Sequence, residues 1–332
     1  MNFNEILAQL QKNVYQPIYF LMGEETYFID EICNYITAHA LDDSEREFNQ
    51  TTLYGKDTDV GTIIAQAKRF PLMGSRNLVI IKEAQHIRKI DDLAPYLEQP
   101  QAATILVICY KYKTLDKRKT FTKELAKKAV LFESKKLYEN QVPSWIQNYL
   151  KQNNYSIHLK AAHLLAEYLG ADLSKINKEL DKLMLIVEKG SEINLEIIEQ
   201  NIGISKDFNN FELNNAMARK DVLRANLISN YFAANPKDNP FVVTISVLFG
   251  FFHKTLIYHT LKDKSKNTVA SALKINPFFV KDYELAARNY SKSKLLQIIS
   301  LLREYDLKSK GVDNSSITDG ELIKELVYKI LH

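Results

Sequence analysis

The stretch IYFLMGEET at residues 18–26 decides which fold this chain can adopt. Its first five residues are apolar or aromatic, and a short run of this kind predicts a buried strand. Gly23 ends the run, and apolar residues at helical spacing follow from Glu25 to Ala40. A nucleotide-binding chain carries its phosphate loop between such a strand and helix. Here Glu24 and Glu25 stand at that place, and two carboxylates would repel a triphosphate.

The same alternation of strand and helix continues through the first part of the chain. Continuous apolar strands separated by helices are typical of a parallel sheet that is covered on both faces. We therefore expect an α/β domain at residues 1–140. Further strands are expected at residues 78–81, 104–109 and 130–132, and helices at 60–69 and 115–129.

Beyond residue 140 the strand pattern disappears, and apolar residues recur at helical spacing to the end. The last helix begins with a capping box, in which Thr318 and Glu321 can each satisfy the other's backbone N–H. We expect two helical domains, at residues 141–206 and 207–332. Two further helices are expected between residues 211 and 232, separated by a break near Lys220. The other helices are predicted at residues 142–153, 161–169, 172–184, 195–201, 240–261, 291–311 and 318–331.

Composition limits the class of protein. The 332 residues suffice for two or three domains, and 46% hydrophobic with 25% charged residues excludes a disordered chain. There are only 10 glycines, or 3%, where about 7% is usual. Such a chain is expected to be rich in helix and is unsuited to a glycine-rich nucleotide loop. The only cysteines, Cys33 and Cys109, lie in apolar segments and are expected to be small core residues of a protein in a reducing compartment.

No segment is predicted to cross or target a membrane. The strongest apolar run, residues 241–252, has 12 residues, whereas a spanning helix needs roughly 20. We expect it to form a buried helix. The first residues carry an acid and several amides where a signal peptide needs a basic and then an apolar stretch. A cytoplasmic protein is therefore expected.

The sequence lacks the motifs of enzymatic chemistry. The only Gly-Lys pair, Gly55-Lys56, has Gln50 in place of the first glycine of a phosphate loop and Asp57 in place of its hydroxyl. There is no C-x2-C or H-x3-H zinc spacing and no G-x-S-x-G. These absences favour a binding or structural protein, with no catalytic residues, cofactor or metal, over an enzyme.

A basic segment is the first candidate for binding. Residues 111–136 contain ten basic and three acidic residues, a net charge of +7 within a chain whose net charge is +4. Such a patch can attract phosphates or an acidic neighbouring protein. Spacing alone favours a solvated helix face, and the alternatives stay open here.

An apolar segment is the second candidate. Phe70, Pro71, Leu72 and Met73 follow the helix expected at residues 60–69 and precede a polar loop. Large apolar side chains at a helix end are suited to insertion into a partner's pocket. Covering the end of the sheet is an equally good explanation from the sequence.

Several motifs, in this order and spacing, resemble the delta subunit of the bacterial DNA polymerase III clamp loader. The resemblance extends over essentially the whole chain. Each motif is weak by itself, but together they are specific. They are YFLMGEE at residues 19–25, FPLMGSR at 70–76 running into LVII at 78–81, LDKRK at 115–119, GADL at 170–173 and YDLK at 305–308.

The resemblance implies an AAA+-like fold that has lost ATP binding, followed by a lid-like helical domain and a C-terminal helical collar. It implies that the chain binds the sliding clamp (beta) and opens the ring for loading onto primed DNA, without hydrolysing ATP itself. It further implies assembly through the collar with the gamma/tau ATPase subunits and delta-prime, within the DNA polymerase III holoenzyme.

The family's clamp contact is an apolar pair that falls here on Leu72 and Met73, with Phe70 and Pro71 adjacent. The family commonly has an aromatic residue at the second position, so Phe70 and Met73 both remain candidates for the main anchor beside Leu72. Residues 117–119, which are Lys117, Arg118 and Lys119, resemble the family's basic motif, and contact with DNA or with a neighbouring subunit stays open. The alternative function is a stand-alone helical DNA-binding or scaffold protein.

Overall fold

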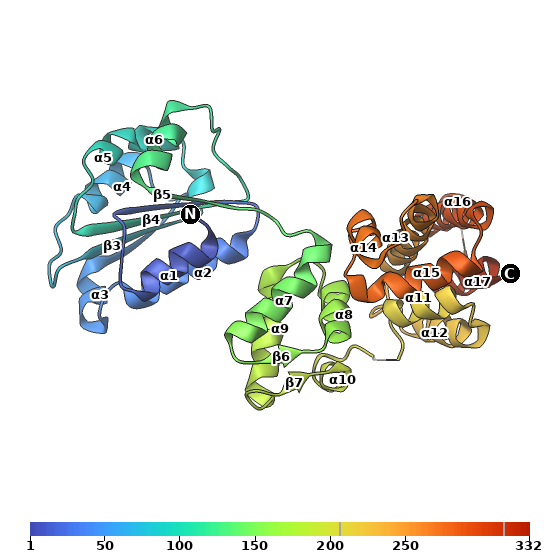
Figure 1. Ribbon diagram of the computed structural model, residues 1–332. Helices are drawn as coiled ribbons and strands as arrows, with labels where there is room; N and C mark the ends of the chain where they lie inside the picture. The colour runs from blue at the N-terminus through green and yellow to red at the C-terminus, as the bar shows by residue number, and fades with distance from the viewer. Residues whose placement is uncertain (206, 315) are drawn as a thin grey trace. The chain divides into compact units, whose positions relative to one another are not determined.

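The computed structural model describes residues 1–205, 207–314 and 316–332 (Figure 1). The chain forms two compact units. The first consists of Met1–Tyr138 together with Asp172–Ser174, and the second of Glu139–Ala171 and Lys175–His332. The division into three domains at residues 1–140, 141–206 and 207–332 stays a prediction.

A five-stranded parallel sheet forms the centre of the first unit, in the order β2-β3-β4-β1-β5. Every residue of β1 is buried, because β4 and β5 flank it and helices cover both of its faces. The predicted parallel α/β fold is confirmed. The strands are β1 (Ile18–Gly23), β2 (Gln50–Tyr54), β3 (Asn77–Lys82), β4 (Thr104–Lys111) and β5 (Val130–Ser134).

Alternate residues of β1 enter two separate cores. Tyr19 and Leu21 pack with α1 and α2 on one face, whereas Phe20 and Met22 pack with α4 and α6 on the other. Because both faces of β1 are buried, its residues are apolar throughout rather than alternately apolar and polar. The helices of this unit are α1 (Phe3–Gln11), α2 (Thr26–His39), α3 (Asp43–Asn49), α4 (Val60–Ala67), α5 (Ala94–Glu98) and α6 (Thr120–Lys128), with 3-10 turns at Ala84–His86 and Ile90–Leu93.

The structure corrects the prediction for this unit in several places. The helices α1, α3 and α5 and the strand β2 were not predicted. β2 is an edge strand whose residues, QTTLY, are half-buried or exposed, so it has no apolar run. The helix expected from residue 115 begins only at Thr120, because Asp116 accepts hydrogen bonds from the backbone and side chain of Arg118 and holds a turn before it.

Four helices and a small sheet follow β5. The sheet pairs β6 (Ser156–Ile157) with β7 (Glu192–Ile193) in parallel, so the prediction that strands end near residue 140 is wrong in this detail. Strands of two residues are too short to produce a periodic pattern. The helices are α7 (Val142–Gln152), after a 3-10 turn at Glu139–Gln141, α8 (Leu159–Leu169), α9 (Leu173–Ile186) and α10 (Leu195–Ile202).

In its described residues, the last part of the chain has helices and loops but no strands. The predicted break near Lys220 is confirmed: Lys220 has φ +54°, and Asp221 accepts from the Arg224 N–H at 3.0 Å to cap the next helix. The Thr318 capping box is also present. The helices are α11 (Asn210–Arg219), α12 (Val222–Ala234), α13 (Phe241–Thr260), α14 (Lys266–Leu273), α15 (Val280–Asn289), α16 (Lys292–Ser309) and α17 (Asp319–Leu331), with a 3-10 turn at Pro277–Phe279. Of these, α14 and α15 were not predicted.

Helix α13 is the one helix among the described residues that is long and apolar enough to cross a membrane, by length and composition alone. Its buried residues, including Leu248 and Phe252, belong to the core of the helical region. Core helices of globular proteins pass the same test of length and composition. Residues 241–252 were expected to form a buried helix, but Phe249 within this run is 45% exposed and stacks on His253.

Gly23 offers a direct test of the sheet. Its φ is +134°, and a Cβ there would overlap the carbonyl oxygen of Ser134 on the paired strand β5. We expect Gly23→Ala to lower the free energy of unfolding by about 3 kcal/mol or more, measured by urea unfolding followed by circular dichroism.

The matched control is Gly250→Ala in α13, where a Cβ would meet nothing within 4 Å. It should raise the free energy of unfolding by about 0.5–1 kcal/mol through helix propensity. An unchanged unfolding midpoint for Gly23→Ala would contradict the close approach of β1 and β5.

Candidate functional site

The chain's own groups occupy the place where a phosphate loop would lie. The backbone N–H of Gly23 donates to Lys113 O at 3.0 Å, and that of Glu24 donates to Ser134 O at 3.0 Å. The buried Glu25 side chain caps α2 by accepting from Tyr27 N at 3.1 Å, and burial raises its pKa. In a phosphate loop such N–H groups point at the anion. Here the N–H groups of Gly23 and Glu24 have partners within the chain, and the Glu25 carboxylate caps the start of α2.

The apolar residues 70–73 lie at the tip of the loop formed by residues 68–76, between α4 and β3 (Figure 1). Phe70 is 75% exposed, Leu72 70% and Met73 52%, while Pro71 is half-buried. These side chains therefore do not cover the end of the sheet, and that alternative from the sequence is wrong. We call residues 70–73 the apolar tip.

The base of this loop is fixed from both sides. Asn77 Nδ2 donates to Gln66 O at 3.3 Å, and the Tyr96 hydroxyl donates to Ala67 O at 3.3 Å. Beyond the tip, the guanidinium of Arg76 lies 4.9 Å from the centre of the Tyr15 ring. The loop thus leaves and re-enters the domain at defined points, so the apolar tip is held away from the core.

Asn49, the last residue of α3, also contacts the loop, and sequence reasoning missed it. Its buried side-chain amide hydrogen-bonds to the backbone of Leu72 and Met73. These partners are 23 and 24 residues away in the sequence, so no local pattern marks Asn49.

The basic segment is largely paired with acids. Six of its ten basic side chains form ion pairs. Three acidic partners, Asp30, Asp91 and Glu98, come from outside residues 111–136, and counting charges along the segment therefore overestimated the patch. The three predicted contact residues are all paired: Lys117 with Glu133 at 2.6 Å, Arg118 with Asp116 at 2.8 Å and Lys119 with Asp91 at 2.7 Å.

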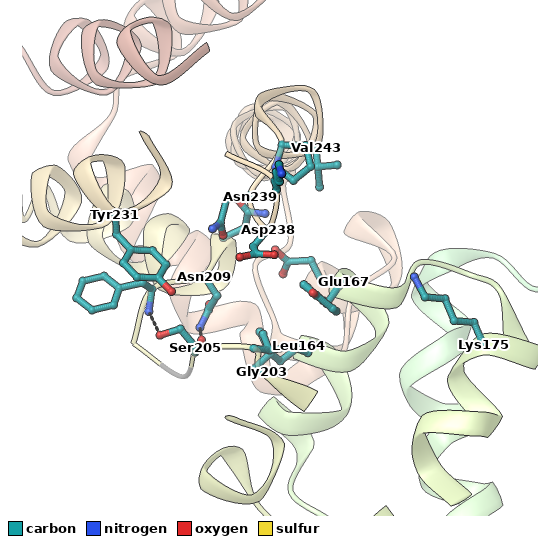
Figure 2. Close-up of a pocket in the computed structure, with 16 residues that line it drawn as sticks. Leu164, Glu167, Lys175, Gly203, Ser205, Asn209, Tyr231, Asp238, Asn239 and Val243 are labelled. Carbon is teal, nitrogen blue, oxygen red and sulfur yellow. Dashed lines mark hydrogen bonds between the residues drawn. The ribbon is translucent and has the colours of Figure 1, made fainter. Parts of the chain in front are cut away.

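A cavity of about 270 Å³ lies in the second unit, between α8, the residues before α11 and the start of α13. Figure 2 shows the carboxylates of Glu167 and Asp238 pointing toward one another there. Burial raises the pKa of Glu167 to about 7, and a hydrogen bond with Asn210 acts in the opposite direction. Within the described residues, no group of His, Cys, Asp and Glu side chains is suited to hold a metal.

Glu167 predicts a pH dependence of stability. Because its folded pKa lies above the ordinary value of 4.5, the folded chain binds the proton more tightly than the unfolded chain. Stability should therefore fall as the pH rises from about 4.5 to 7. Glu167→Gln keeps an acceptor for Asn210 but cannot ionise, so it should exceed the wild type in stability at pH 8 by about 1 kcal/mol, or roughly 2–4 °C, and by much less at pH 5.

The fluorescence of Trp145, the only tryptophan, reports thermal unfolding of the same unit, because Trp145 lies in α7. A difference between Glu167→Gln and the wild type that stays constant from pH 5 to pH 8 would contradict the raised pKa.

Two family models match the chain. The model of the DNA polymerase III delta subunit matches residues 19–135, and the model of its C-terminal domain matches residues 207–326. Together they cover more than two thirds of the chain. The first model includes the apolar tip and the basic segment except for Lys136.

Similarity to known proteins extends along the chain. A curated relative, DNA polymerase III subunit delta of Bacillus subtilis (strain 168), is 28% identical over 335 residues, covering 97% of this chain and 96% of the relative. The solved structure of the Bacillus subtilis DNA clamp loader delta protein (YqeN) matches with 26% identity and a TM-score of 0.57, covering 99% of each chain. The predicted resemblance and fold class are confirmed.

Proposed function

The chain belongs to the family of DNA polymerase III delta subunits, and from this premise we propose that it binds the sliding clamp and opens the ring for loading onto primed DNA. Its partners in this proposal are the beta clamp, the gamma/tau ATPase subunits, delta-prime and primed DNA. The protein then acts in the cytoplasm, where the chromosome is replicated.

The observation that carries the proposal is the exposure of the apolar tip. Phe70, Leu72 and Met73 present three large apolar side chains on one short loop, and no part of the first unit covers them. Exposed apolar clusters of this kind are typical of surfaces that bind a partner. Burying such side chains in a pocket supplies the main energy of a protein interface.

Leu72 and Met73 are the proposed anchors, with Phe70 and Pro71 at their side. Asn49 holds the backbone of Leu72 and Met73, whereas its side chain makes no hydrogen bond to Phe70 in the described structure. A side chain on a fixed backbone enters a pocket with a smaller loss of conformational entropy. Met73 replaces the aromatic residue common at its position, and its flexible thioether can fill the same pocket.

The chain is proposed to leave ATP hydrolysis to its neighbours and to have no catalytic activity of its own. The hydrogen bonds of Gly23 and Glu24 and the buried carboxylate of Glu25 support this proposal, because they occupy the place of a phosphate loop. In the first unit the apolar tip is already exposed. ATP in the neighbouring subunits would then favour complexes in which the tip reaches an open clamp, by differential binding.

The helical regions are proposed to serve as a lid-like domain at residues 141–206 and an oligomerisation collar at residues 207–332. Lys117, Arg118 and Lys119 are proposed to contact phosphate or carboxylate groups, which DNA and a neighbouring subunit both supply. Their side chains are 68%, 91% and 57% exposed, so such groups can reach them despite the ion pairs.

Replacing the anchors tests the clamp contact. We expect Leu72→Ala/Met73→Ser to weaken binding to the clamp of the same organism about 100-fold, because anchor residues of an interface carry about 2–4 kcal/mol. Surface plasmon resonance with immobilised clamp measures the affinity. Phe70→Ala should have a smaller effect than Met73→Ser.

The matched control is Leu223→Ser in α12, since Leu223 is 72% exposed and Leu72 is 70% exposed. It should bind the clamp like the wild type. No clamp binding by the wild type, or equal binding by the anchor variant, would overturn the proposal.

Charge reversal separates the two contacts proposed for the basic residues. If these residues bind DNA, Lys117→Glu/Arg118→Glu should weaken DNA binding by the assembled loader. The slope of log affinity against log salt concentration should also become less steep, by about 0.9 for each phosphate that the variant no longer neutralises. If they bind a subunit, the variant should assemble poorly in gel filtration with the partner subunits. Wild-type assembly and wild-type salt dependence together would exclude both contacts.

A further inference from the structure

The side chain of Asn49 is buried against the backbone of the apolar tip. It is 1% exposed, although asparagine is mostly found at protein surfaces. Its Oδ1 accepts from Leu72 N at 2.8 Å and from Met73 N at 3.4 Å, and its Nδ2 donates to Met73 O. Both ends of the side-chain amide are therefore engaged by the same two residues of the tip.

A side-chain amide supplies both the acceptor and the donor that this position requires. One end of the amide must accept two N–H groups, and the other must donate to a carbonyl. Aspartate would retain the acceptor but would place a second carboxylate oxygen against Met73 O. Alanine would leave two N–H groups and a carbonyl of the loop without these partners.

Asn49 itself is fixed by the fold. It ends α3 and directly precedes β2, which pairs with β3 from Gln50 opposite Leu78. Arg46 links α3 to the preceding helix by donating to Ala38 O. The loop also needs Gly74, whose φ is +67° and whose missing Cβ leaves room for the Glu45 side chain of α3. Figure 1 shows this loop beside α3.

We infer that Asn49 is the positioning residue of the clamp contact: it holds the backbone of Leu72 and Met73 in the binding conformation before the clamp arrives. This inference rests on the proposed function. An irregular loop with exposed apolar side chains would otherwise sample many conformations and lose them on binding. The amide of Asn49 reduces this loss without touching the clamp.

The test compares two substitutions with a matched control in the full chain. Asn49→Ala removes the amide, and Asn49→Asp keeps the volume but removes the donor. Both should weaken clamp binding about tenfold, because the tip must then be ordered on binding. The control is Asn209→Ala, since Asn209 is also buried and also bonds backbone groups, at Ser205 O and Glu212 N, but lies in the second unit. It should bind the clamp like the wild type.

Hydrogen–deuterium exchange distinguishes positioning from a loss of structure. In both Asn49 variants, exchange should rise in residues 70–76 and stay unchanged in β1 and β4. Faster exchange throughout the sheet would overturn the inference, because Asn49 would then act by stabilising the whole domain. Wild-type affinity in both variants would also overturn it.

The anchor variant Leu72→Ala/Met73→Ser separates the inference from the proposed function. If it loses clamp binding while the Asn49 variants keep it, the clamp contact stands and the role of Asn49 is wrong. If the wild type does not bind the clamp, both are wrong.

Discussion

The close approach of β1 and β5 at Gly23 is the constraint on which the first unit depends. The backbone carbonyl of Ser134 lies where a Cβ of residue 23 would stand, and it also accepts from the N–H of Glu24. This pairing holds β1 in the sheet between β4 and β5. It also engages the N–H of Glu24, and in a phosphate loop such groups point toward the anion. The same contact therefore supports the fold and closes the place of the phosphate loop.

Two surfaces of the first unit are candidates for binding a partner. One surface is apolar, small and held at its base by Asn77 and within the loop by Asn49. The other carries basic side chains that are largely balanced by neighbouring acids. Both surfaces are formed by segments that follow or precede strands of the same sheet, so the rigid sheet determines where they stand.

Elements with a strong local pattern were predictable. The run at residues 18–22, the break at Lys220 and the capping box at Thr318 depend on neighbours within a few residues, and the structure contains all three. β2 was missed because an edge strand is half-exposed and carries polar residues. Phe249 was misplaced because helical spacing identifies a stripe but not its width, and packing by neighbouring helices decides which side chains stay exposed.

The sequence by itself determined the parallel α/β fold, the helical region after residue 140, the lack of a phosphate-loop motif and the apolar run at residues 70–73. Each of these depends on residues that are close to one another in the sequence. Only the tertiary structure decided that residues 70–73 are exposed, that Asn49 holds their backbone and that Lys119 is paired with Asp91. The partners in these contacts lie 23 and 28 residues apart along the chain. No periodic pattern spans such distances, and side chains of this kind meet only when strands and helices pack together.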